Sequence, residues 1–87
     1  MTNREEILEG IKEILLTVRT IDPEKVKGIT EQTDFLADLH TPSTELINIA
    51  AKAEHKFGVE FEDDDIDDLG STIKDIIDLI IKAKERG

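Results

Sequence analysis

The stretch from Phe35 to Leu46 reads FLADLHTPSTEL and contains the start of a long predicted helix. Pro42 suits the first helical position, because its backbone angle is already helical and its missing N–H is not needed there. Thr41 is a residue type that often caps helices, and a following proline favours the extended backbone that a cap requires. We therefore expect this helix to begin near Thr41–Pro42, with Thr41 as its N-cap.

The same helix is predicted to end at Phe57. Its apolar residues recur with helical spacing: Leu46, Ile49, Ala50, Ala53 and Phe57. Gly58 directly follows, and glycine is the residue that most often ends a helix in a left-handed conformation.

Two further long helices are predicted on either side. The first covers roughly residues 3–18 and has one apolar stripe, formed by Ile7, Ile11, Ile14, Leu15 and Val18. Thr2 and Glu5 have the spacing of a capping box at its start. The last helix runs from about Thr72 to Lys84, where Thr72 and Asp75 have the same spacing.

The connections complete an all-α bundle of three long helices plus one short helix, with a long first loop. The short helix is expected within the acidic run from Glu60 to Asp68. In the first loop, Asp22-Pro23-Glu24 is either a turn or the start of a short helix. Apolar anchors of that loop are expected at Phe35, Leu36 and Leu39. The expected core comprises Ile7, Ile14, Leu46, Ala50, Phe57, Phe61, Ile66, Ile76 and Ile80.

Composition limits the classes of function. The chain has 87 residues, which predicts a single domain over 1–87. Its formal net charge is -10, so we expect no binding to nucleic acid and a preference for basic partner surfaces. It has no cysteine and no apolar run long enough for membrane insertion, and it begins without signal-peptide features. We expect a cytoplasmic monomer.

Ser43 is the residue whose surroundings suggest chemistry. It lies in the first turn of the predicted second long helix, where backbone N–H groups lack partners and the helix dipole is positive. These groups would stabilise a phosphodiester attached to the serine. A lone serine at a helix start is, however, most often an ordinary structural residue.

The wider pattern resembles the acyl carrier protein family. In that family an Asp-Leu pair leads through a short loop to a modified serine, and the helix that follows ends at Phe-Gly or a similar pair. Here Asp38-Leu39 precedes the serine, Asp38 lies five residues before Ser43, and Phe57 lies fourteen after it. Both spacings match the family, and the similarity extends from the first predicted helix to the last.

The resemblance implies a carrier and not an enzyme. Ser43 would be the attachment point for 4′-phosphopantetheine, delivered from coenzyme A by a separate phosphopantetheinyl transferase. The thiol of the arm would hold acyl groups as thioesters for acyl-transfer or synthase enzymes. A specialised fatty-acid, lipid or polyketide-type pathway is the implied setting.

Three positions depart from the family pattern around the serine. Pro42 replaces an acidic residue, Thr44 replaces a leucine, and His40 replaces a glycine. A transferase normally reads the first two. The alternative function is therefore an unmodified, acidic protein–protein interaction module that keeps the carrier fold.

The helix after Ser43 is the expected docking surface for partner enzymes. In the family this helix is usually acidic, but here Lys52 and Lys56 balance Glu45 and Glu54, which favours a dedicated set of partners. We expect docking through Thr44, Glu45, Ile47, Asn48 and Ala51. Ile47 and Ala51 share the flank of Ser43, and the sequence leaves open whether they are exposed or packed inside.

No other site is predicted. The acidic run does not fit a calcium-binding loop: counted from Asp63, the twelfth residue is Lys74, and counted from Asp65 it is Ile76. His40 and His55 are fifteen residues apart and have no obvious metal or acid–base partner. We therefore expect neither a metal site nor catalytic residues.

Overall fold

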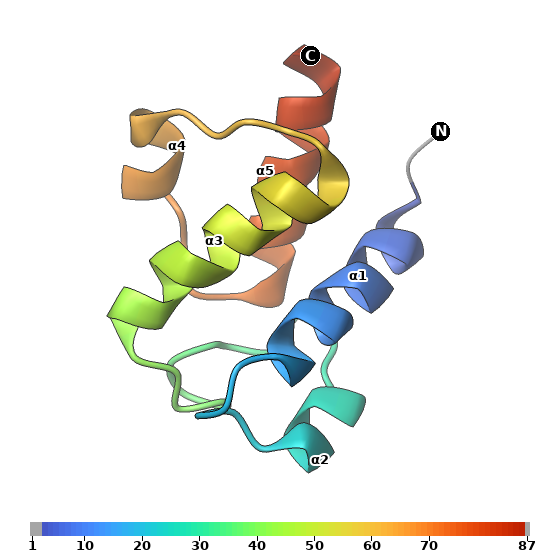
Figure 1. The fold of residues 1–87 in the computed structure, drawn as a ribbon, viewed down its shortest axis with the longest axis vertical. Coiled ribbons are helices and arrows are strands. Elements are labelled where there is room, and N and C mark those ends of the chain that lie inside the picture. Colours follow the sequence, from blue (N-terminus) through green and yellow to red (C-terminus); the bar gives the residue numbers. More distant parts are fainter. Residues whose placement is uncertain (1–2, 87) are drawn as a thin grey trace.

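The computed structural model describes residues 3–86 and shows an all-α bundle (Figure 1). Its helices are α1 (Arg4–Leu16), α2 (Pro23–Lys27), α3 (Ser43–Phe57), α4 (Asp63–Asp67) and α5 (Ile73–Arg86). The long helices α1, α3 and α5 pack on one another, α2 packs against α1 at one end of the bundle, and α4 lies between α3 and α5 along the chain. The predicted fold class is confirmed, and the long first loop contains the short helix α2 that Pro23 permitted.

One cluster of aliphatic side chains forms the core. Each long helix contributes fully buried residues, such as Ile11 in α1, Ile49 in α3 and Ile77 in α5. Of the predicted core, Ile7, Ile14, Ala50, Ile76 and Ile80 are buried, whereas Leu46, Phe57, Phe61 and Ile66 are only partly buried. The spacing of the aliphatic residues therefore predicted the centre of the core correctly, but it overestimated the burial of residues at the edge of the core.

The helix ends explain why these segments stop and start where they do. Gly58 has a φ of 66° and ends α3 in the left-handed conformation, as predicted. The capping box of α5 is also confirmed, because the backbone N–H of Thr72 donates to Asp75 and that of Asp75 donates to the Thr72 hydroxyl. The predicted capping residue Thr2 lies outside the described residues. Asn3 is the N-cap of α1, and its side chain accepts from the N–H of Glu5.

The start of α3 differs from the prediction. Pro42 has a ψ of 146°, which is extended and not helical, so Pro42 is the N-cap and Ser43 is the first helical residue. Thr41 is consequently too far from the first turn to cap it. It is 2% exposed, and its hydroxyl has no hydrogen-bond partner in the part of the chain that the structure describes.

The other error concerns Leu36. It was expected to anchor the first loop, but its side chain is 44% exposed, whereas Phe35 and Leu39 are buried as predicted. The reason is local: residues 34–39 form a turn, which directs Phe35 and Leu39 inward and leaves Leu36 outside. No helix within residues 3–86 is both long and apolar enough to cross a membrane.

Candidate functional site

Ser43 is the first residue of α3 and its side chain is exposed. The helix start that carries it has no side-chain cap, unlike α1, α2 and α5, whose first-turn N–H groups donate to the side chains of Asn3, Asp22 and Thr72 respectively. The first N–H groups of a helix have no acceptor within the helix. At α3 the N–H of Glu45 donates to the carbonyl of Pro42 at 2.9 Å, so the donors that remain available beside the serine hydroxyl are the N–H groups of Ser43 and Thr44.

Asp34 holds the loop that leads to the serine. Its carboxylate accepts hydrogen bonds from the backbone N–H groups of Leu36 and Ala37, at 2.7 and 2.8 Å, and from the Ser71 hydroxyl at 2.7 Å. The N–H of Ala37 and the hydroxyl of Ser71 hold the pKa of this carboxyl below its usual range, because they stabilise the charged form. Asp34 therefore stays ionised at neutral pH and keeps the turn closed.

Asp38, the residue that carries much of the family pattern, completes the same turn. Its side chain accepts from the N–H of Asp34 at 2.8 Å, and its own N–H donates to the Asp34 carbonyl at 2.9 Å. Beyond it, the N–H of Thr41 donates to the carbonyl of Phe35 at 2.8 Å. These bonds fix the direction in which the chain enters α3.

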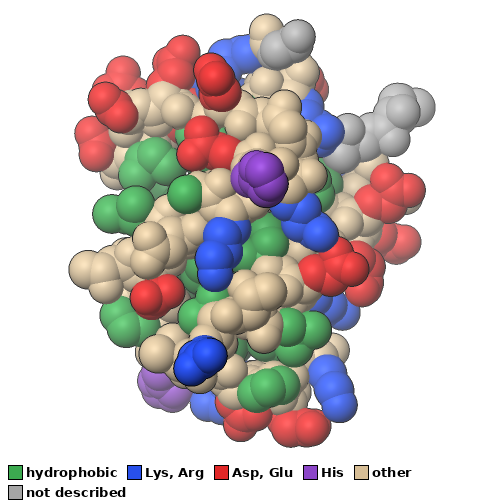
Figure 2. Space-filling model, in the orientation of Figure 1, with side chains coloured by type: hydrophobic (Ala, Val, Ile, Leu, Met, Phe, Trp, Pro, Cys, Tyr) green, Lys and Arg blue, Asp and Glu red, His purple; other side chains and the backbone are tan. Residues whose placement is uncertain are grey.

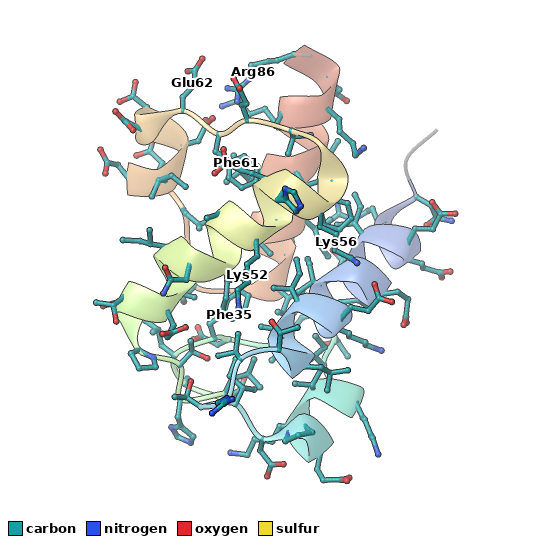
Figure 3. The ribbon with its side chains drawn as sticks, in the orientation of Figure 1. Phe35, Lys52, Lys56, Phe61, Glu62 and Arg86 are labelled. Carbon is teal, nitrogen blue, oxygen red and sulfur yellow. The ribbon has the colours of Figure 1, made fainter. Side chains whose placement is uncertain are left out.

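The loop is also tied to the start of α5. The N–H of Phe35 donates to the carbonyl of Ser71 at 2.7 Å, and the N–H of Ile73 donates to the carbonyl of Thr33 at 2.9 Å. Phe35 itself is buried in the core (Figure 3). Ser43 thus stands at the end of a loop that is anchored by hydrogen bonds on one side and by an aromatic ring on the other.

His40 gives this loop an unusual backbone. Its φ is 54°, the left-handed region in which glycine is favoured, and it is the only non-glycine residue with a positive φ among residues 3–86. The loop needs this conformation to turn into Thr41 and α3. The resemblance described above has a glycine at this place, and here a histidine adopts the glycine conformation.

The predicted docking residues lie together on α3. Thr44, Ile47, Asn48 and Ala51 are exposed, and Glu45 is partly buried. Ile47 is 60% exposed, so the question that the sequence left open is answered in favour of exposure for both Ile47 and Ala51. An exposed isoleucine beside the serine provides an apolar contact for a partner.

The geometry fits a phosphodiester at Ser43. The hydroxyl faces solvent, so an enzyme can reach it, and the uncapped first turn of α3 offers N–H donors and the positive end of a helix dipole to a negative group. The loop before it is rigid, so the attachment point has a fixed position. The arrangement is therefore suited to a covalently attached group that carries a negative charge.

Comparison with known proteins also supports a covalently attached phosphodiester group in this protein. The family model described as the phosphopantetheine attachment site matches residues 9–80. This chain belongs to that family of carrier proteins. It is 35% identical over 77 residues to an acyl carrier protein of Coprothermobacter proteolyticus, covering 88% of this chain and 89% of that protein.

Other acyl carrier proteins match over similar lengths. The meromycolate extension acyl carrier protein of Mycobacterium leprae is 37% identical over 82 residues, which is 94% of this chain and 68% of the relative. The acyl carrier protein of Thermosynechococcus vestitus is 35% identical over 78 residues, which is 90% of this chain and 91% of the relative. The carrier family thus includes relatives that align with nearly all of this chain.

Sequence reasoning missed the role of Asp34 and Ser71 in building this carrier's site. Asp34 binds the N–H groups two and three residues after it, which is a turn pattern that aspartate commonly forms. That local signal is present in the sequence. The partner Ser71 lies 37 residues away, and no local pattern identifies it.

Proposed function

We propose that this protein carries acyl groups as thioesters on a 4′-phosphopantetheine arm attached at Ser43. The observation that carries the proposal is the exposed serine at the uncapped start of α3, within the span that matches the phosphopantetheine attachment family. When attached, the arm supplies the thiol on which acyl groups are held.

The residues of this chain position the arm and do not catalyse its attachment. A phosphopantetheinyl transferase would bind the loop and α3. The Ser43 hydroxyl would form the new bond to phosphorus as the pyrophosphate bond of coenzyme A breaks, losing its proton to that enzyme and releasing adenosine 3′,5′-bisphosphate. The N–H groups of Ser43 and Thr44 then stabilise the charge of the product. The protein is accordingly a carrier and not an enzyme.

Its partners and setting follow from this role. The exposed residues Thr44, Ile47, Asn48 and Ala51, with the partly buried Glu45, would dock a transferase and acyl-transfer or synthase enzymes. We propose a cytoplasmic monomer with one carrier domain over residues 1–87. Relatives named for meromycolate extension agree with service in a dedicated lipid pathway.

Intact-mass measurement tests the proposal. Coexpression with a broad-specificity transferase should add one phosphopantetheine to the wild type and none to Ser43→Ala. Thr20→Ala is the matched control, because it removes an exposed hydroxyl outside the docking residues, and it should still be loaded. Since the chain has no cysteine, loading should also create one thiol per chain.

If neither a broad-specificity transferase nor one from the native host adds mass to the wild type, the proposal fails. That result would favour the unmodified interaction module.

A further inference from the structure

A shallow groove runs between α1 and α3, and we call it the α1–α3 groove. One part is lined by Leu16, Thr17, Lys52, His55 and Lys56, together with the acidic Glu13. The adjoining part also contains Thr17 and Lys52, so the two parts are continuous, and it extends to Arg19, Asn48, Ala51 and the acidic Glu45. Figure 3 shows that Lys52 and Lys56 extend from α3 on the side facing α1.

Leu16 makes the groove apolar at its surface. It is 53% exposed at the end of α1 and is one of three large hydrophobic side chains exposed within residues 3–86, the others being Leu36 and Ile47. Exposure of a leucine inside a groove leaves apolar area that a partner can cover.

The groove has three cationic side chains, Lys52, Lys56 and Arg19, against two acidic ones, Glu13 and Glu45, on a chain whose net charge is -10. Lys56 is paired with Glu13 at 2.6 Å, and the Lys52 ammonium donates to the Thr17 hydroxyl at 3.1 Å. Lys52 and Arg19 have no carboxylate partner within residues 3–86 and are therefore free to pair with one from outside. Figure 2 shows lysine and arginine side chains across the middle of this face, acidic side chains gathered over α4, and further acidic side chains beside the basic ones.

The groove is continuous with the docking surface next to Ser43. Asn48 and Ala51 line the groove and also belong to that surface. Lys52 lies nine residues after Ser43 on the same helix, which is about 14 Å along its axis. Nine residues are two and a half helical turns, so Lys52 lies on the opposite flank of α3 from Ser43, and a partner seated in the groove would approach the serine through Asn48 and Ala51.

We propose that the α1–α3 groove docks an acyl-transferring enzyme through an acidic segment, with an apolar side chain placed on Leu16 and carboxylates paired with Lys52 and Arg19. The inference rests on the proposed carrier function and names the partner surface as acidic. Opposite charges speed association and select the partner, and the apolar contact adds affinity.

A protein segment fits the groove better than an anionic membrane does. A membrane surface is broad and would also meet the acidic residues of α4 and the rest of a chain with 21 acidic residues. A narrow segment can pair with Lys52 and Arg19 without meeting the acidic residues of α4.

The test uses ¹⁵N-labelled full-length protein carrying the arm and two helical peptides of equal length. Both peptides carry the same leucine and phenylalanine stripe, flanked by glutamates in one and by lysines in the other. The variant is Arg19→Glu with Lys52→Glu. The matched control is Lys25→Glu with Lys27→Glu, which makes the same change in net charge at two exposed residues of α2.

The glutamate peptide should shift the amide signals of Leu16, Thr17, Ala51 and Lys52, bind more weakly as salt is raised, and lose about tenfold in affinity for the groove variant but not for the control. Equal binding of both peptides, equal loss in both variants, or shifts elsewhere would overturn the inference. Phosphatidylglycerol vesicles form a third arm, and shifts of the groove signals with vesicles but not with the glutamate peptide would also overturn it.

Loading of Ser43 distinguishes the two levels of failure. A protein that is loaded normally but does not bind the acidic peptide refutes the docking inference and leaves the carrier function intact. A protein that is never loaded refutes the proposed function first.

Discussion

Thr41 is the residue at which packing and polarity conflict. Its side chain is buried in the approach to α3, and its hydroxyl has no partner within residues 3–86. A buried hydroxyl without a hydrogen bond costs free energy, because it has lost its water and gained nothing in return.

Thr41→Val should therefore raise the free energy of unfolding by about 1 kcal/mol, since valine keeps the shape and removes the unpaired group. Urea unfolding followed by circular dichroism measures the change. Thr44→Val, at an exposed position of α3, should change it by less than about 0.5 kcal/mol. A loss of stability in Thr41→Val would show that the hydroxyl has a partner after all.

His40 is a second residue under local strain, because its φ of 54° costs free energy for any residue with a side chain. His40→Gly should raise the free energy of unfolding by about 0.5–1 kcal/mol, after the greater freedom of glycine in the unfolded chain is subtracted. Thermal unfolding checks this.

His55→Gly is the control, since His55 lies within α3. It should lower stability by about 1 kcal/mol, because glycine is a poor helix former. If both glycine substitutions lower stability, the positive φ of His40 does not destabilise the folded protein.

At the residue scale, the position of Ser43 could be predicted because it depends on spacings to Asp38 and Phe57 that survive in the sequence. The capping of α3 could not. Threonine before proline is compatible with an N-cap, but the choice between Thr41 and Pro42 depends on whether the threonine side chain turns inward. The inward direction of the Thr41 side chain depends on how the preceding loop packs, and Phe35 and Leu39 fix that packing by entering the core.

Among the elements, the short helix α4 is joined to α5 by ion pairs of a single side chain. Asp65 is buried on this short helix and pairs with Arg86 at 2.7 Å and with Lys82 at 3.4 Å, both from α5. Figure 3 shows Arg86 near the segment that carries Glu62. The hydrogen bond from Arg86, the backbone N–H of Glu62 and Lys82 hold the pKa of Asp65 well below its usual range.

Asp65 should therefore make stability depend on pH. Because its pKa is lower in the folded than in the unfolded protein, its contribution is complete above the usual pKa of about 3.9 and is lost as the pH falls below that value. Asp65→Asn should lower the urea midpoint at neutral pH and reduce the further loss on acidification.

The control for this comparison is Asp67→Asn, at an exposed residue of the same helix. Urea unfolding at neutral pH and at about pH 3 gives both slopes. An Asp65→Asn slope equal to that of the wild type would contradict the role assigned to the pair with α5.

The sequence identified the three long helices because their apolar residues repeat over many turns. It predicted α4 as a short, irregular helix within the acidic run but not its bounds, since five residues carry too short a pattern. The ion pair that fixes α4 joins positions 21 residues apart, and an acidic run contains no signal for which carboxylate turns inward. Asp65 was therefore not distinguishable from Asp63 or Asp67.

At the scale of the whole molecule, charge repulsion opposes folding, because 21 acidic residues face 11 basic ones. Raising sodium chloride from low to moderate concentration should screen this repulsion and raise the thermal midpoint. Potassium chloride should act equally, since screening does not depend on the cation. A midpoint that falls with salt would show that the ion pairs contribute more than the repulsion costs.

The carrier framework and the site are linked at this scale. Ser43 has its position because the loop before it is bound to the start of α5 and its helix is packed on α1 and α5. The similarity to carrier relatives extends over 88–90% of the chain, which includes the loop, α3 and the start of α5.

The most direct test of the central claim is the location of the arm. Protein coexpressed with a broad-specificity transferase should be digested, and the fragment that spans α3 sequenced by tandem mass spectrometry. The account predicts one phosphopantetheine, on Ser43. An arm on Thr44, or a fragment that stays unmodified with every transferase tried, would contradict it.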